Sequence, residues 1–327
     1  MTPSTSELAQ LPLNFWPVGQ VSALSQRQGR YTRASGRHPG KMLPELARRF
    51  LLAYTRPGDW ILDPMSGIGT TGVEAIHLGR NYVGVEIEPR YVRWQQENLA
   101  LAREQGATGT AEVLLGDARR LAEPGTEAAP LTAGPVDAIL TSPPYGSWLG
   151  ASYSGQRFWE TPLAGEPEVD EPADASLRDL TQIFRGGAAI LKPGGILAAV
   201  VRPVRAGYRL RPFHHAVAQL CQQAGLEWID ELVALLGRVE TAPGGAARVY
   251  HHAHYFRRAV VAQVRRSGYP VTLDQFEYVL VFRKPLPSPT HQLRLPAPRK
   301  SDLSAALAGP DTPREWRAEV PVIRRPA

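Results

Sequence analysis

The sequence is poor in cysteine: Cys221 is the only one among 327 residues. A single thiol cannot close an internal disulfide, so the sequence predicts a fold without cross-links and a reducing, cytoplasmic location. The sequence also lacks an apolar run of about eighteen residues, and we therefore expect no membrane span. The N-terminus lacks the basic-then-apolar pattern of a signal peptide, which argues against secretion.

Acidic residues are fewer than basic ones, with 31 Asp and Glu against 37 Lys and Arg, and the net charge is +6. Such a balance favours polyanionic partners, because basic side chains displace counterions from phosphates. A coding bias toward Arg, Ala, Gly and Pro explains the composition equally well, so charge alone assigns no partner. Hydrophobic residues make up 43% of the chain, which is enough for a buried core.

Apolar strands alternate with amphipathic helices along most of the chain, which predicts an α/β fold. The fold class we expect is a doubly wound, mostly parallel seven-stranded sheet. Strands are predicted at 60–62, 82–85, 112–115, 136–140, 196–201, 231–236 and 277–282. Helices are predicted at 42–54, 69–78, 90–103, 177–191 and 212–224.

The alternation of predicted strands and helices divides the chain into three parts. Residues 1–36 show no clear periodicity and are predicted to form an N-terminal arm, whereas 37–284 form the α/β domain. Two stretches interrupt this domain, 146–175 and 237–270, and we expect both near the substrate face because long insertions are often functional. Residues 285–327 form a tail rich in Pro and Arg.

A glycine-rich segment, 63–72, follows the first predicted strand and opens a helix. Gly67, Gly69 and Gly72 satisfy the Gly-x-Gly-x-x-Gly fingerprint of dinucleotide-binding folds, and Glu86 lies about 20 residues on, as that fingerprint expects. A carboxylate at the end of the next strand can hold both hydroxyls of a ribose. On this motif alone, an NAD-dependent dehydrogenase is a live alternative.

Asp63 argues against the dehydrogenase. A carboxylate at the strand end would repel a pyrophosphate, yet it suits the amino group and the sulfonium side of S-adenosylmethionine. Asp117 closes the third strand, where it could accept a hydrogen bond from an adenine amino group. The three strand ends together therefore favour S-adenosylmethionine as the cofactor.

The hexapeptide 141–146, Thr-Ser-Pro-Pro-Tyr-Gly, follows the fourth strand. Pro143 and Pro144 fix the backbone and remove two N–H donors, so carbonyl groups point outward in a set direction. An exocyclic amine needs such acceptors, and Ser142 can add a side-chain acceptor. Tyr145 offers a flat face for an extruded base. Ligands of open α/β sheets bind at the carboxyl ends of strands, so we expect these four residues to be catalytic.

At this point the chain resembles the S-adenosylmethionine-dependent amino-methyltransferases of DNA, in the Ser-Pro-Pro-Tyr form typical of cytosine-N4 enzymes. Segment 63–71 is similar to motif I of that family, 142–145 to motif IV, 38–46 to motif X and 277–282 to the last strand. The similarity covers about residues 37 to 284 and implies that the predicted sheet is of the Rossmann-like methyltransferase type. The resemblance and the motifs together predict these cofactor-binding residues: Lys41, Asp63, Pro64, Met65, Ser66, Gly67, Gly69, Thr70, Thr71, Glu86 and Asp117.

Other chemistry is less well supported by the residues. Cys221 lies in an apolar helix without the flanking proline of a cytosine-C5 nucleophile, and we expect it in the core. No metal site is expected, because His251, His252 and His254 are flanked by aromatic and basic residues, which favours a nucleic-acid-contacting or solvated loop. Trp148, Tyr153, Phe158 and Trp159 either close over the substrate or form a small satellite core.

The sequence therefore predicts direct methyl transfer from S-adenosylmethionine to an extruded base of DNA, with cytosine N4 as the target and no covalent intermediate. The family's usual target-recognition domain is hard to find in this chain. RNA guanine-N2 and DNA adenine-N6 methylation stay open, because related tRNA enzymes carry similar segments. Two readings of another class remain, the NAD-dependent dehydrogenase and an inactive nucleic-acid-binding protein.

Overall fold

The computed structural model describes residues 13–123, 135–145, 174–206, 208–241, 245, 247–250 and 255–287. By its internal contacts the chain divides into two units; one is Asn14–Pro287, and the other is Met1–Leu13 with Ser288–Ala327, of which only Leu13 is described. Among the described helices, none has the length and apolar character that a membrane crossing requires.

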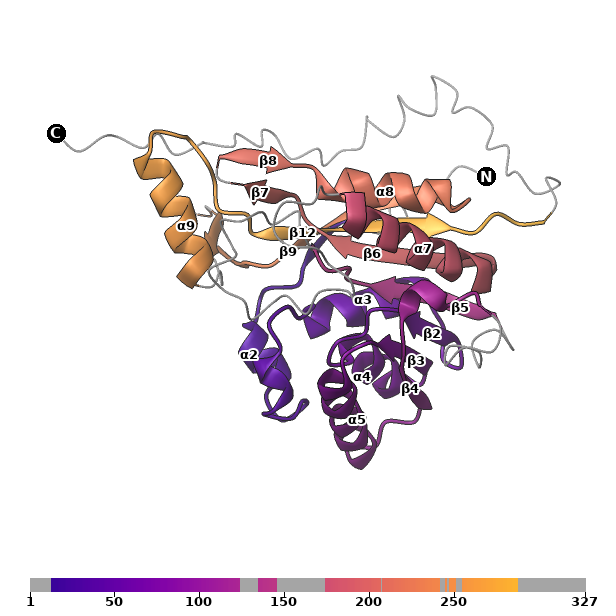
Figure 1. Cartoon of the computed structure of the whole chain (residues 1–327). Coiled ribbons are helices and arrows are strands. Elements are labelled where there is room, and N and C mark those ends of the chain that lie inside the picture. The colour runs from indigo at the N-terminus through magenta and orange to yellow at the C-terminus, as the bar shows by residue number, and fades with distance from the viewer. Residues whose placement is uncertain are drawn as a thin grey trace, which may run out of the picture. The chain divides into compact units, whose positions relative to one another are not determined.

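The unit Asn14–Pro287 contains a central sheet, helices on both of its faces and two small hairpins (Figure 1). The sheet strands are β1 Phe15–Pro17, β2 Trp60–Asp63, β3 Asn81–Glu86, β4 Ala111–Leu115, β5 Val136–Thr141, β6 Leu191–Val201, β9 Glu227–Leu235 and β12 Phe276–Arg283. The hairpin strands are β7 Val204–Ala206 with β8 Arg209–Arg211, and β10 Arg238–Thr241 with β11 Ala247–Tyr250. The helices are α2 Ala23–Arg27, α3 Pro44–Tyr54, α4 Thr70–His77, α5 Pro89–Glu104, α7 Asp174–Ile190, α8 Phe213–Gln223 and α9 Tyr255–Arg266, with 3-10 turns η1 Ser35–Arg37 and η2 Ala118–Arg120.

The strand order is β1-β9-β12-β6-β5-β2-β3-β4. Every neighbouring pair is parallel except those of β12, which runs antiparallel to both β6 and β9. The mostly parallel, doubly wound sheet is thus confirmed. The chain winds outward from β2 in both directions, so β2 and β5 flank the point where the strand order reverses, and open α/β sheets bind ligands at such a point.

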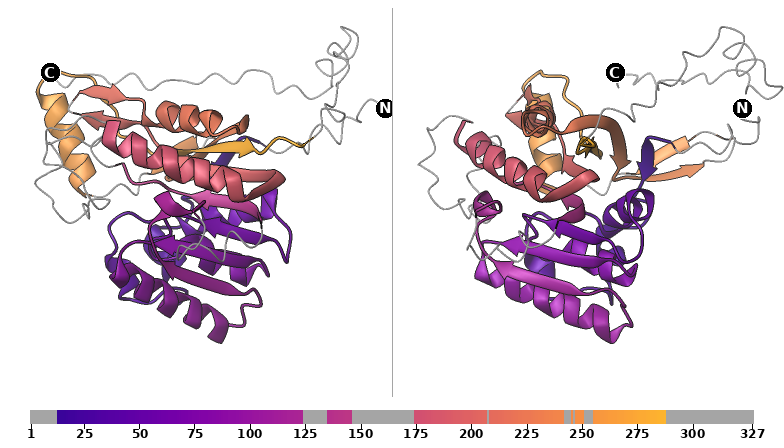
Figure 2. Two further views of the ribbon diagram at one scale, coloured as in Figure 1. Left: turned by 45° about the vertical axis from the view of Figure 1, so that its right-hand side comes forward. Right: turned by 90° about the vertical axis from the view of Figure 1, so that its right-hand side faces the viewer.

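Two hydrophobic cores cover the two faces of the sheet. Successive strand residues alternate between them: Ile61 joins the core under α3 and α4, and Leu62 joins the core under α7 and α8. Figure 2 shows these helix pairs on opposite sides of the sheet. The near-continuous apolar strands in the sequence reflect this burial on both faces, because a strand covered on both sides has no polar face.

The sheet has one strand more than the seven that the sequence predicts. β1 pairs in parallel with β9, aligning Phe15 with Val233 at the sheet edge. This strand and α2 fall within residues 1–36, where the sequence shows no periodicity. A three-residue strand that ends at Pro17 and pairs with a segment more than 200 residues away leaves no local signal.

Candidate active site

Asp63 ends β2 at the carboxyl edge of the sheet and is only 3% exposed. Its carboxylate accepts hydrogen bonds from the Thr71 hydroxyl at 2.8 Å and from the Met65 backbone N–H at 3.2 Å. Burial raises the pKa of Asp63 to about 6, and the hydrogen bond from Thr71 opposes that rise. The group is therefore a buried carboxylate that is ionised at neutral pH and is suited to a cationic partner.

The loop after Asp63 depends on glycine for its conformation. Gly67 and Gly69 have φ values of 53° and 76°, in the left-handed region, and Gly69 is the N-cap of α4. A Cβ on Gly69 would also lie 2.6 Å from the Gln95 side chain, and one on Gly72 would collide with the Tyr82 ring. The glycine fingerprint thus sets a tight turn that side chains at Gly69 and Gly72 would disrupt.

Gln95 of α5 is hydrogen-bonded to this loop. It was not identified from the sequence. It is fully buried, donates from Nε2 to the Ser66 hydroxyl at 2.9 Å, and accepts from the Tyr82 hydroxyl at 3.0 Å. The Ser66 hydroxyl in turn donates to a β3 carbonyl at 3.0 Å. A polar residue on the buried stripe of a helix is the signal that could have found it.

Glu86 ends β3 and is also buried. Oε2 accepts from the Gly67 N–H at 2.7 Å and Oε1 from the Glu88 N–H at 2.9 Å. Burial raises the pKa of Glu86, while the hydrogen bonds from these two backbone groups oppose that rise. The two carboxylate oxygens together can accept about four hydrogen bonds, and the backbone N–H groups of Gly67, Ile87 and Glu88 supply three of them, so acceptor capacity remains for a ribose hydroxyl.

The Lys41 side chain is hydrogen-bonded to the turn at residues 36–38, which lies beside the glycine-containing loop after Asp63. Its ammonium donates to the Gly36 carbonyl at 2.9 Å and to the His38 carbonyl. Burial lowers the pKa of Lys41 to about 8. The His38 ring lies next to Gly67, packs edge-on against Tyr91 at 4.2 Å between centroids, and has its pKa lowered to about 4 by burial. A neutral imidazole is therefore held beside the glycine loop, within the segment 38–46 that resembles motif X.

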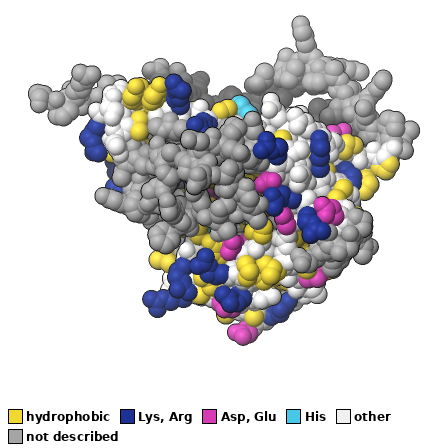
Figure 3. Space-filling model, viewed as in Figure 1, with side chains coloured by type: hydrophobic (Ala, Val, Ile, Leu, Met, Phe, Trp, Pro, Cys, Tyr) yellow, Lys and Arg dark blue, Asp and Glu magenta, His cyan; other side chains and the backbone are white. Residues whose placement is uncertain are grey.

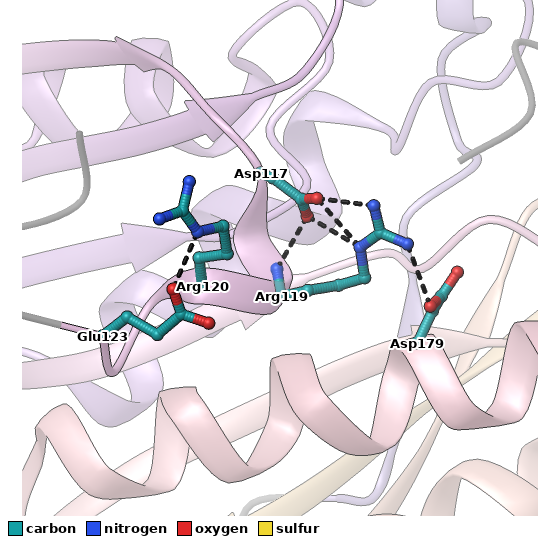
Figure 4. Close-up of polar contacts among 5 residues, drawn as sticks. All are labelled: Asp117, Arg119, Arg120, Glu123 and Asp179. Carbon is teal, nitrogen blue, oxygen red and sulfur yellow. Dashed lines mark hydrogen bonds and ion pairs between the residues drawn. The ribbon is translucent and has the colours of Figure 1, made fainter. Parts of the chain in front are cut away.

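Asp117 follows β4 and caps η2, where Arg119 engages it closely (Figure 4). The Arg119 backbone N–H donates to Oδ1 at 2.9 Å, and the guanidinium donates to both carboxylate oxygens at 2.6–3.0 Å. Burial alone would raise the pKa of Asp117, but these bonds hold it below its usual value. Arg119 also reaches Asp179 of α7 at 3.2 Å, so an adenine contact through Asp117 requires Arg119 to release it.

The other predicted cofactor residues line the same turn. Pro64 is buried directly after β2, and Met65 packs against the core under α7 and α8. Thr70 is the first residue of α4 and is 5% exposed. The structure therefore places them in the turn after β2 and the first residues of α4, and their contact with a cofactor stays a prediction.

The predicted catalytic segment begins directly after β5, which pairs with β2 and aligns Ile139 with Leu62. The Ser142 hydroxyl donates to the Val200 carbonyl of β6 at 3.2 Å. A hydroxyl has one hydrogen and two lone pairs, so this bond leaves acceptor sites on Ser142. Pro143 is buried and Pro144 is exposed, which anchors one end of the rigid dipeptide.

Two residues hold the ring of Tyr145. Phe213, the fully buried first residue of α8, contacts it edge-on at 5.2 Å between centroids. The Arg202 guanidinium, just after β6, lies over the ring at 5.3 Å from its centroid. The sequence reasoning missed both residues, because segments 57 and 68 positions away bring them to Tyr145 and local pattern does not report such contacts.

Cys221 is fully buried in α8, which confirms its place in the core, and burial raises the pKa of its thiol. Several residues considered for the substrate side lie outside the described residues: Trp148, Tyr153, Phe158, Trp159, His251, His252 and His254.

Comparison with known proteins adds to this geometry. Residues 4–97 match the family model N6_N4_Mtase, described as DNA methylase. The chain is 41% identical over 70 residues to Type II methyltransferase M2.DpnII of Streptococcus pneumoniae, covering 21% of this chain and 26% of that protein. It is 33% identical over 104 residues to DNA adenine methyltransferase YhdJ of Escherichia coli, covering 32% and 33%.

A third relative acts on RNA by its name. The chain is 40% identical over 123 residues to tRNA (guanine(10)-N2)-dimethyltransferase of Methanothermobacter thermautotrophicus, covering 37% of this chain and 32% of that protein. The matched segments thus span 26 to 33% of the relatives' own length. By the family match and the relatives named for DNA, the matched part of the chain is similar to methyltransferases of DNA.

Proposed function

We propose that this protein transfers the methyl group of S-adenosylmethionine to the exocyclic amino group of an extruded base in DNA, with cytosine N4 as the target. One observation carries the proposal. The buried carboxylate Asp63 and the Ser142–Tyr145 segment follow two paired parallel strands, β2 and β5, at the same edge of the sheet. A cofactor held at the first strand end would therefore lie beside a base held at the second.

The residues of the first strand end suit the cofactor. Asp63 would pair with its cationic amino group, the turn containing Gly67 and Gly69 would allow close backbone approach, and Glu86 would accept from the ribose hydroxyls. When bound, S-adenosylmethionine supplies a methyl group activated by the sulfonium. Charge opposes a dinucleotide here, because the phosphates would face the Asp63 carboxylate.

The residues of the second strand end suit an amine. Ser142, with its own hydrogen committed to Val200, accepts from an amine N–H and so helps to free the nitrogen lone pair. Tyr145 provides the stacking face. With the amine aligned there, a bound cofactor would supply the methyl group and leave as its thioether, and the proton of the methylated nitrogen would pass to solvent. Position and alignment supply the acceleration, so no enzyme nucleophile is required.

Guanine N2 of tRNA is the second candidate, favoured by the 40% identity over 123 residues to a tRNA dimethyltransferase. Adenine N6 is a further candidate, favoured by the 33% identity over 104 residues to a relative named as a DNA adenine methyltransferase. The serine at the first position of Ser142–Tyr145 favours cytosine N4, because that form is typical of cytosine-N4 enzymes.

The test is transfer of isotope-labelled methyl from S-adenosylmethionine to duplex DNA and, separately, to bulk tRNA, with the product identified by nucleoside mass spectrometry. The proposal predicts labelled N4-methylcytosine from DNA. Label only in N6-methyladenine or N2-methylguanosine would overturn the target and keep the chemistry. An absence of label in both substrates would overturn the proposed activity.

A further inference from the structure

The β7–β8 hairpin lies next to the Ser142–Tyr145 segment, where we propose that the base binds. Arg202 lies two residues before β7 and Phe213 two residues after β8, and these are the two residues that contact the ring of Tyr145. Both ends of the hairpin are thus fixed at the Ser142–Tyr145 segment. A ligand bound at the far end of the hairpin would therefore have a fixed position relative to the Ser142–Tyr145 segment.

The far end of the hairpin carries an exposed pair of aromatic rings. Tyr208 stacks on Tyr269, which follows α9, with ring centroids 4.1 Å apart and planes within 4° of parallel. Both side chains remain substantially exposed, at 44% and 42%. The Arg209 guanidinium lies over Tyr208 at 5.6 Å from its ring centroid. The pair joins the hairpin to the loop after α9 and presents flat aromatic surface to solvent rather than closing a core.

The hairpin and the helix that precedes Tyr269 are rich in arginine. Segment 202–211 contains four arginines and no acid, and α9, Tyr255–Arg266, also contains four arginines and no acid. The whole chain, by contrast, has 31 acidic residues to 37 basic ones, so this concentration is local. In Figure 3, basic and hydrophobic side chains lie next to one another at the upper left, over α9 and the hairpin.

Flat aromatic rings among guanidinium groups fit a nucleic-acid strand, because bases stack on the rings while phosphates pair with arginine. An acidic peptide would satisfy the charge but has no planar groups to stack at each position. We propose that this Tyr208–Tyr269 platform, with Arg209, binds the nucleic-acid strand next to the extruded base. The proposal rests on the proposed function, and it assigns the substrate contact to the fold's own hairpin and helix, with no separate recognition domain required.

The test measures binding apart from methyl transfer. Fluorescence anisotropy with a labelled DNA duplex, in the presence of S-adenosylhomocysteine, gives the affinity of the wild type, Tyr208→Ala, Tyr269→Ala and Arg209→Gln. We expect each tyrosine variant to bind at least about five-fold more weakly, since stacking on one aromatic side chain is worth that much or more. Arg209→Gln should lower the slope of log affinity against log salt by about one.

Matched controls come from the opposite edge of the sheet. Trp228 and Arg283 are similarly exposed but lie at the amino end of β9 and the carboxyl end of β12, so Trp228→Ala and Arg283→Gln should bind as the wild type does. Arg209 is fully exposed, so its variant keeps the test valid if a tyrosine variant fails to fold.

The outcomes separate the two proposals. If the wild type binds and methylates the duplex but the Tyr208, Tyr269 and Arg209 variants match the controls, the platform is wrong and the proposed function stands. If the wild type neither binds nor methylates DNA or tRNA, the proposed function itself fails. Loss of affinity in the platform variants with unchanged affinity for S-adenosylmethionine supports the platform.

Discussion

The carboxyl edge of the sheet has two halves that are built differently. At β2 and β3, buried polar groups fix the loop through hydrogen bonds, as when Glu86 binds Gly67 and Gln95 binds Ser66. At β5 and β6, the ring of Tyr145 is held by an aromatic edge and by a cation over its face. Hydrogen bonds impose direction, whereas ring contacts tolerate displacement, so the first half is fixed in advance and the second can adapt to its ligand.

This contrast predicts that variants in the first half abolish cofactor binding and that variants in the second half spare it. The largest effect is expected for Asp63→Ala, which removes a buried charge together with the acceptor for Thr71 and Met65. A hydrogen bond to a charged group contributes about 1.5–3 kcal/mol, so calorimetry should show S-adenosylmethionine bound about 100-fold more weakly. Asp59→Ala, at the other end of β2, is the control, and an unchanged affinity in Asp63→Ala would remove the cofactor assignment.

Ser142→Ala should follow in size, with the loss confined to the transfer step. It removes an acceptor that we expect to act on the amine as charge develops, and loss of one such group typically costs about 100-fold in rate. Single-turnover transfer to DNA is the measurement, with S-adenosylmethionine affinity as the internal control. Ser142→Thr keeps the hydroxyl and should retain most of the rate; equal rates in the Ala variant and the wild type would exclude Ser142 from the reaction.

The ionisation of Asp63 should make cofactor binding depend on pH. Because burial raises this pKa to about 6, the carboxylate is ionised above that pH and becomes neutral below it. A cationic cofactor group requires the ionised form, so S-adenosylmethionine affinity should be constant above pH 7 and fall about ten-fold per unit below pH 6. Asp63→Asn should bind weakly with a flat profile over the same range, and a pH dependence that survives this substitution would point to another group.

Arg202→Gln should give the smallest effect. A cation over an aromatic ring contributes about 0.5–1 kcal/mol at a partly exposed site, which corresponds to a two- to five-fold lower transfer rate. Cofactor affinity should not change, because Arg202 acts through Tyr145 in the second half of the edge. Partial rescue by Arg202→Lys would support the positioning role, and a wild-type rate in Arg202→Gln would show that Phe213 alone holds the ring.

The sequence predicted the parts of the fold that have local signals. The apolar strands and capped helices from Trp60 to Glu104 lie within one or two residues of their predicted ends, because burial on both faces and glycine turns leave their mark on neighbouring positions. β1, the β7–β8 and β10–β11 hairpins and α9 were missed. Their strands are three or four residues long, and α9 lies in an arginine-rich stretch that reads as a solvated loop.

The candidate site also contains residues that the sequence could place and residues that it could not. Asp63, Glu86 and Ser142 could be placed because each follows an apolar strand, and the carboxyl ends of parallel strands meet at one edge. The neighbours of those residues could not be placed. Arg202 reaches Tyr145 only through the pairing of β5 with β6, which is a tertiary contact without a local signal.

The most direct test of this division is Tyr145→Ala, studied by calorimetry and by single-turnover methyl transfer on the same protein sample. We expect unchanged affinity for S-adenosylmethionine and a transfer rate at least about five-fold lower, because the base loses its stacking face. A variant that transfers methyl to DNA at the wild-type rate would contradict the placement of the extruded base against Tyr145.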